Sequence, residues 1–131
     1  MLIDTHILIW MLNNSDPGRL GDRALMILKT QPVTVSVASL IEIAVKKRKG
    51  KLTAPETDEI LNDLLSKNAA VLNVEAQHIS SFPRLESSLH ADPFDLLLVA
   101  QAISEKIPFI TNDSEILKIN YPGLRLIDGR L

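Results

Sequence analysis

Cysteine is absent from this sequence of 131 residues. Its absence excludes a disulfide framework, a thiolate nucleophile and a cysteine-based zinc site. Oxygen ligands are therefore the metal chemistry to expect from this chain. A protein without disulfides also fits a reducing compartment.

Aromatic residues and an excess of positive charge are missing as well. Only 4% of the residues are aromatic, and 14 Lys and Arg stand against 16 Asp and Glu, which gives a net charge of -2. The chain thus lacks the stripe of basic and aromatic residues that stacks single-stranded bases, and its overall charge does not attract a polyanion. Any nucleic-acid binding must be local and rest on shape and backbone contacts.

No apolar run approaches the roughly 18 residues of a membrane span. The N-terminus also lacks the basic start of a signal peptide, so we expect a cytoplasmic protein with no membrane partner. Apolar residues make up 46% and charged residues 23% of the chain, a balance that excludes disorder. The length suits one hydrophobic core, and we expect a single domain over residues 1–131.

Short apolar runs alternate along the chain with longer segments of helical periodicity. A helix between successive strands is typical of a crossover, and such crossovers build parallel sheets with helices on both faces. The sequence therefore predicts an α/β fold with a mostly parallel central sheet. Strands are expected at residues 2–3, 33–37, 71–74, 109–110 and 124–127.

Cap residues and apolar periodicity set the expected limits of the helices. One helix follows the first strand and ends near residue 13, and the others are expected at residues 39–50, 57–67, 92–106 and just after residue 113. The turn-rich passage over residues 83–93 is expected to form a surface loop beside a site.

Acidic residues stand at the starts of four predicted helices: Asp4, Glu42, Asp95 and Asp113. Each has an ordinary structural explanation. Ser39 and Glu42 match a capping box, Asp92 and Asp95 suit the N-cap and third position of a helix, and Asp113 suits an N-cap. Asp4 suits the same role before Thr5.

Their arrangement in the fold suggests more than capping. The starts of the helices in a parallel α/β fold meet at one edge of the sheet, so four caps become one acidic cluster. Like charges crowded there destabilise the fold unless a cation neutralises them or one carboxylate binds a proton. All-oxygen ligands select a hard ion, which indicates Mg²⁺ or Mn²⁺ rather than zinc. The cluster predicts metal-assisted phosphate chemistry.

Four segments carry a resemblance to a known family. The segments are MLIDTH at 1–6, SVASLIEIAVK at 36–46, DPFDLLLVAQA at 92–102 and TND at 111–113. They resemble the four acidic blocks of PIN-domain ribonucleases, most closely those of the VapC toxin branch. The blocks occur in the family's order and spacing across nearly the whole chain. Two positions depart from the pattern: Ile41 stands where many relatives carry Trp, and Leu96 where Arg is frequent, which removes any substrate contact of that Arg.

The resemblance implies a PIN-like three-layer fold and a Mg²⁺- or Mn²⁺-dependent ribonuclease. It assigns catalytic roles to Asp4, Glu42, Asp95 and Asp113, with Asp4, Asp95 and Asp113 as metal ligands. A metal-activated water would attack the phosphate in line and leave 5′-phosphate and 3′-hydroxyl ends. The resemblance further implies the toxin of a toxin–antitoxin pair, which is usually a homodimer and is silenced by a small antitoxin.

Residues beside the acids are candidates to orient the carboxylates or a bound water, although most of them are also common turn or cap residues. These candidates are Thr5, Ser39, His90, Asp92, Thr111 and Asn112. The histidines lack a metal-ligand spacing, and His6 and His78 are expected to be packed or solvated. The run Lys46, Lys47, Arg48 and Lys49 favours a helix end and is also a candidate for contacts with RNA phosphates.

Two other functions are compatible with acids at a sheet edge. A receiver-like phosphoacceptor domain requires adjacent acids after the first strand, where this chain has only Asp4. A binding module that keeps the fold without catalysis would not require all four acids. For the antitoxin, the apolar content predicts docking on residues 7–12 and 60–65.

Overall fold

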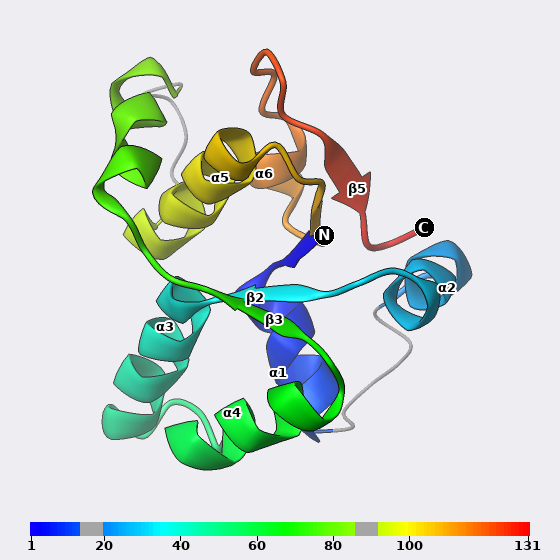
Figure 1. Ribbon diagram of the computed structural model, residues 1–131, viewed down its shortest axis with the longest axis vertical. Coiled ribbons are helices and arrows are strands. Elements are labelled where there is room, and N and C mark those ends of the chain that lie inside the picture. Colours follow the sequence, from blue (N-terminus) through cyan, green and yellow to red (C-terminus); the bar gives the residue numbers. More distant parts are fainter. Residues whose placement is uncertain (14–19, 86–91) are drawn as a thin grey trace.

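The computed structural model describes residues 1–13, 20–85 and 92–131. In these ranges the chain forms one parallel sheet of five strands in the order β3-β2-β1-β4-β5 (Figure 1). The strands are β1 (Leu2–Ile3), β2 (Thr34–Ser36), β3 (Ala70–Leu72), β4 (Phe109–Thr111) and β5 (Leu126–Asp128). All the expected strands are present, within a few residues of their predicted limits.

Helices connect the strands as the alternating pattern predicts. They are α1 (Thr5–Asn13), α2 (Asp22–Thr30), α3 (Val37–Arg48), α4 (Thr57–Ser66), the 3-10 helix η2 (Ala76–Arg84), α5 (Pro93–Glu105) and α6 (Ser114–Leu117). In Figure 1, α5 and α6 lie on one side of β2 and β3, and α1 and α4 lie on the other. The fold is thus a three-layer α/β sandwich.

Neighbouring residues of the central strands face the two helical layers, because side chains alternate along a strand. Leu2 and Phe109 pack in one buried cluster with side chains of α5 and α6. Ile3 and Ile110 pack in a second cluster with side chains of α1 and α4. The sheet is therefore buried on both faces, which explains why its strands are apolar runs without polar alternation.

Three predictions about local structure were wrong or incomplete. Helix α3 starts at Val37, and its N-cap is Ser36, whose hydroxyl accepts a hydrogen bond from the Ala38 amide at 3.0 Å. Ser39 therefore lies inside the helix and forms no capping box with Glu42. Helix α2 was not expected, and the first part of the predicted loop, up to Arg84, belongs to η2. Asp92 and Pro93, at the other end of that loop, belong to the start of α5, and residues 86–91 lie outside the described residues.

The apolar residues predicted to receive an antitoxin differ in their exposure. Ile7, Leu8, Ile60 and Leu64 are at most 3% exposed, whereas Leu65 is 66% exposed. The remaining apolar residues of these two stretches are half-buried at the edge of the core, and antitoxin docking on α1 and α4 stays a prediction. Among residues 1–13, 20–85 and 92–131, no helix combines the length and the apolar character that crossing a membrane requires.

Candidate active site

The strand order reverses between β1 and β4, the two central neighbours of the sheet. The chain leaves β1 toward β2 on one side and leaves β4 toward β5 on the other, so a crevice opens at the carboxyl ends of these strands. Asp4 directly follows β1, and its amide continues the ladder to Ile110 O at 3.1 Å. Thr111 ends β4, and Asp113 comes two residues later. The topology thus places Asp4 and Asp113 at the usual ligand site of such a sheet.

Asp4 is only 2% exposed and is held by hydrogen bonds from both sides. The hydroxyl of Thr111 donates to Oδ2, and the amide of His6 donates to Oδ1 at 3.3 Å. Burial alone would raise the pKa of Asp4, but the hydrogen bonds from His6 and Thr111 outweigh it and keep the pKa below the ordinary value. Asp4 is therefore a fixed, ionised carboxylate.

Thr111 also positions the second acid of the crevice. Its hydroxyl accepts a hydrogen bond from the Asp113 amide at 3.0 Å while it donates to Asp4. Asp113 in turn caps α6, since its Oδ1 accepts from the amides of Glu115 at 2.8 Å and Ile116 at 3.2 Å. The capping role predicted for Asp113 is confirmed, and Oδ2 is the oxygen that this cap does not use.

Glu42 reaches the same edge from the second turn of α3 and is 3% exposed. Its Oε2 forms an ion pair with Nζ of Lys46 at 2.9 Å. Its Oε1 is buried and accepts no hydrogen bond from any residue that the structure describes. A buried carboxylate oxygen without a donor is costly, so this position favours an additional positive charge.

Asp95 lies in the first turn of α5, where Asp92 is the N-cap and accepts from the Asp95 amide at 3.0 Å. The pKa of Asp95 is raised to about 7, first by burial and then by the negative charges of Asp92, Asp4, Glu42 and Asp113. Acids from α3, from the start of α5 and from the ends of β1 and β4 thus lie within electrostatic reach of Asp95. The structure therefore places Asp4, Glu42 and Asp113 near enough to Asp95 to act on its charge.

The acids fit a hard divalent cation in their chemistry. The donors are carboxylate oxygens, and Oε1 of Glu42 has no partner among the described residues. The raised pKa of Asp95 reflects its burial and the neighbouring negative charges. In the described ranges, however, no group of three His, Asp or Glu side chains is already arranged around one ion position. The assignment of Asp4, Asp95 and Asp113 as ligands remains a prediction.

The profile of the PIN domain matches residues 1–120, which include all four acids. The chain belongs to the PIN domain family. The resemblance found in the four acidic segments is thereby confirmed. No curated protein sequence matches this chain significantly.

Three solved structures with a fold similar to that of this PIN domain are toxin–antitoxin complexes. VapBC2 from Rickettsia felis bound to a promoter DNA fragment matches with a TM-score of 0.67 at 19% identity, over 97% of this chain and 96% of that chain. DNA-bound VapBC from Salmonella typhimurium matches with a TM-score of 0.66 at 21% identity over the same shares. VapBC-5 from Mycobacterium tuberculosis, a member of the VapBC family of toxin–antitoxin systems, matches with a TM-score of 0.58 at 25% identity, again over 97% and 96%.

The small polar residues beside the acids of this PIN domain are mostly buried. Thr5 donates its hydroxyl hydrogen bond to the Ser39 hydroxyl at 2.9 Å, which joins the starts of α1 and α3. Asn112 lies against Gly129, where a Cβ would come within 2.0 Å of the Asn112 Oδ1, so a larger residue does not fit there unless Asn112 moves. Asp92 caps α5, and His90 lies outside the described residues.

Gln101 is a buried polar residue that the sequence analysis missed. Its Oε1 accepts a hydrogen bond from the hydroxyl of Ser36, the N-cap of α3, and its Nε2 donates to Asn73 O at 3.3 Å. Gln101 lies in α5, which carries Asp95, and Ser36 starts α3, which carries Glu42. The pair thus joins two helices of the site. The sequence did contain a signal for this role, because Gln101 is a lone polar residue in the apolar stretch of α5.

The histidines follow the sequence-based expectation where the structure describes them. His78 is completely buried, its Nδ1 accepts from the Glu75 amide at 2.9 Å, and its Nε2 lies 3.0 Å from Oε1 of Glu105. His6 is exposed, and its Nδ1 lies 3.9 Å from Oδ1 of Asp4. The carboxylate of Asp4 raises the pKa of His6. His78 is therefore packed and His6 is solvated at the rim of the site.

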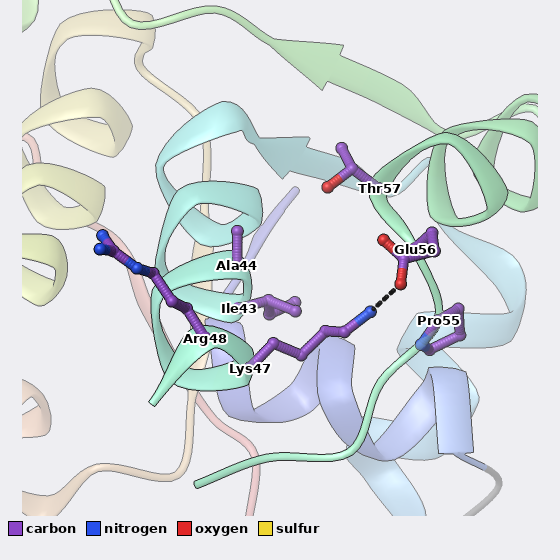
Figure 2. A pocket seen from close by; sticks show the side chains of 7 residues that line it. All are labelled: Ile43, Ala44, Lys47, Arg48, Pro55, Glu56 and Thr57. Atoms are coloured by element: carbon purple, nitrogen blue, oxygen red, sulfur yellow. Dashed lines mark hydrogen bonds and ion pairs between the residues drawn. The ribbon is translucent and has the colours of Figure 1, made fainter. Parts of the chain in front are cut away.

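The basic run at the end of α3 divides between two sides of the helix. Lys46 faces the acids, and its pKa is raised because the ion pair with Glu42 and the charges of Asp92 and Asp95 outweigh the effect of burial. Lys47 points the other way and pairs with Oε1 of Glu56 at 2.8 Å, across a hollow that Arg48 also lines (Figure 2). The basic run predicted to contact RNA phosphates therefore contributes to two different surfaces, one on each side of α3.

The raised pKa of Asp95 predicts how the stability of this PIN domain depends on pH. Without metal, folded Asp95 keeps its proton up to about pH 7, whereas the unfolded chain loses it near 3.8. The contribution of Asp95 to stability is therefore complete below about pH 4 and is lost as the pH rises through 7. We expect Asp95→Asn to raise the free energy of unfolding at pH 8 by about 1–2 kcal/mol, a discounted value because Asp95 is partly exposed, and by much less at pH 4.

Urea unfolding in EDTA at pH 4, 6 and 8 checks this expectation. The exposed Asp58 in α4 provides a control, since Asp58→Asn removes the same charge away from the cluster. If the free energy of unfolding depends on pH equally in Asp95→Asn and the wild type, the neighbouring charges do not destabilise the ionised Asp95.

Proposed function

We propose that this PIN domain is a Mg²⁺- or Mn²⁺-dependent ribonuclease that hydrolyses RNA phosphodiester bonds and acts as the toxin of a toxin–antitoxin pair. The observation that carries the proposal is the gathering of Asp4, Glu42, Asp95 and Asp113 at the switch point of the sheet, with the pKa of Asp95 raised to about 7. Clustered carboxylates at this place suit a divalent ion and a phosphate. The VapBC complexes with the same fold support the toxin role.

The four acids have different tasks in the proposed mechanism. Asp4, Asp95 and Asp113 would hold the ion, and Asp95 releases its proton on loading because a nearby cation lowers the pKa of a carboxyl group. The bound ion supplies Lewis-acid polarisation of the phosphate and lowers the pKa of a water. Thr111 keeps Asp4 oriented through its hydroxyl. The unpaired Oε1 of Glu42 accepts the proton of the attacking water.

The reaction needs no covalent intermediate on the protein. The water oxygen forms a bond to phosphorus, and the bond from phosphorus to the 3′-oxygen breaks on the opposite side. The water proton goes to Glu42, and the departing 3′-oxygen takes a proton from solvent. The products carry a 5′-phosphate and a 3′-hydroxyl.

Incubation of the purified chain with fluorescent RNAs in EDTA, Mg²⁺ or Mn²⁺ tests the proposal. We expect cleavage only with metal, and fragments that a 5′-phosphate-dependent exonuclease degrades. Added Mn²⁺ should also raise the thermal midpoint, because an ion that binds only the folded state stabilises it. Cleavage of equal rate in EDTA, or fragments with cyclic phosphate ends, would contradict the mechanism. Metal binding without cleavage would favour a binding module instead.

The toxin role implies two protein partners, a small antitoxin and a second copy of the chain. Induction of the chain in bacteria should arrest growth, and co-expression of a short upstream reading frame should restore it. Light scattering of the purified chain tests the homodimer. If the Asp95→Asn variant still arrests growth, toxicity does not depend on the acidic site.

A further inference from the structure

A hollow of about 220 Å³ lies directly beside the acidic cluster, between the end of α3 and the start of α5. Glu42 and Asp92 form its acidic side. The remaining wall is made of apolar and basic side chains, which are Val45, Lys46, Lys49, Lys51, Pro93 and Phe94. An RNA strand with one phosphate at the acids would therefore place its neighbouring nucleotide in this hollow.

Lys46 is paired with Glu42, but the other two lysines of the hollow are available for an anion. Lys49 and Lys51 are exposed and form no ion pair with any residue that the structure describes. Lys47 differs, because it is paired with Glu56 in the hollow on the other side of α3 (Figure 2). Lys49 and Lys51 are thus two cations beside the acids that can bind a phosphate.

The apolar wall gives the hollow a second property. Val45 is 37% exposed, and Phe94 is held at the start of α5 by the Asp92 cap and by Pro93 in the first turn. An aromatic ring beside cations suits a nucleobase next to its phosphate, since base stacking and phosphate contacts are the two elements of single-strand binding. An acidic peptide would use the lysines but not the aromatic face.

We propose that this hollow is a nucleotide subsite that binds the RNA residue next to the bond that is cut, with its phosphate on Lys49 and Lys51 and its base against Phe94. The inference rests on the proposed ribonuclease function. It assigns a role to Lys51 and Phe94, and it removes Lys47 and Arg48 from the candidate phosphate contacts.

Fluorescence anisotropy with a labelled RNA of eight nucleotides in Ca²⁺ tests the subsite without requiring cleavage. The variant Lys49→Gln/Lys51→Gln is compared with Lys47→Gln/Arg48→Gln, which removes the same net charge from the other side of α3. We expect the first variant to bind about tenfold more weakly near 0.1 M salt and to lower the slope of log K against log salt by about 1.4, or 0.7 per lysine. In the Lys47→Gln/Arg48→Gln control, both the affinity for RNA and the salt slope should change much less.

A third variant tests the base contact. Phe94→Leu keeps an apolar side chain in the core contact and removes the ring, and we expect about fivefold weaker binding of the RNA. The same variant should bind an abasic oligomer of equal charge as well as the wild type does. Circular dichroism spectra verify that all variants are folded.

Each outcome separates the subsite from the ribonuclease proposal. Equal losses in the two double variants, in a chain that cleaves RNA with Mn²⁺, would overturn the subsite and leave the ribonuclease. Displacement of the RNA by octaglutamate as effectively as by unlabelled RNA would also overturn it, in favour of an acidic peptide. Selective loss in the Lys49 and Lys51 variant of a chain that cleaves RNA supports the subsite. The same loss in a chain that fails to cleave would overturn the ribonuclease and leave the hollow as an RNA-binding site only.

Discussion

Replacement of Asp95 by Asn is expected to reduce RNA cleavage at least about 100-fold, and replacement of Asp4 by Asn to do the same. Each change removes a negative charge and an oxygen ligand from the crevice between β1 and β4. Gel assays with Mn²⁺ measure the rates, and Asp58→Asn in α4 should retain full activity. Activity above a tenth of the wild type in both variants would mean that cleavage does not require these two acids.

The two substitutions should have opposite effects on stability, because the two carboxylates have opposite environments. Asp95 is destabilised as an anion, and its replacement relieves repulsion. Asp4 is stabilised as an anion by hydrogen bonds from His6 and Thr111, and we expect Asp4→Asn to lower the free energy of unfolding by about 1 kcal/mol. Thermal unfolding in EDTA distinguishes the two cases. Stabilisation by both changes would show that repulsion dominates at Asp4 as well.

The second large effect is expected from Thr111→Val. The substitution keeps the shape of a fully buried side chain and removes one hydroxyl, which donates to Asp4 and accepts from the Asp113 amide. A charged hydrogen bond is lost and a polar group is left without a partner, so we expect a loss of about 2–4 kcal/mol in the free energy of unfolding. Cleavage should fall about 10- to 100-fold, because Asp4 loses its orientation.

Thr111→Ser is the matched control, since serine keeps the hydroxyl and removes only a methyl group. We expect it to retain most of the activity and to lose about 1 kcal/mol. Urea unfolding and Mn²⁺ titration of both variants separate stability from metal binding. Equal activity of the Val and Ser variants, measured well below their unfolding temperatures, would refute the positioning role of Thr111.

The sequence by itself determined the alternation of strands and helices, the position of Asp113 as a cap, and the four acids that belong together. These features rest on local rules, since periodicity and cap residues depend on neighbours within a few positions. It did not locate the start of α3, because Ser36 and Ser39 are both good caps and only Ser36 meets Gln101. The family match to residues 1–120 agrees with the segments that carry the acids.

Only the tertiary structure distinguished the roles of equal residue types. Asp4 and Asp95 are the same amino acid, yet hydrogen bonds lower the pKa of Asp4 while burial and neighbouring charges raise that of Asp95. Lys47 and Lys49 belong to one basic run, yet Lys47 is paired with Glu56, whereas Lys49 lines a hollow beside the acids. The physical reason is that charge interactions depend on distance and burial in space, which periodicity along the chain does not record.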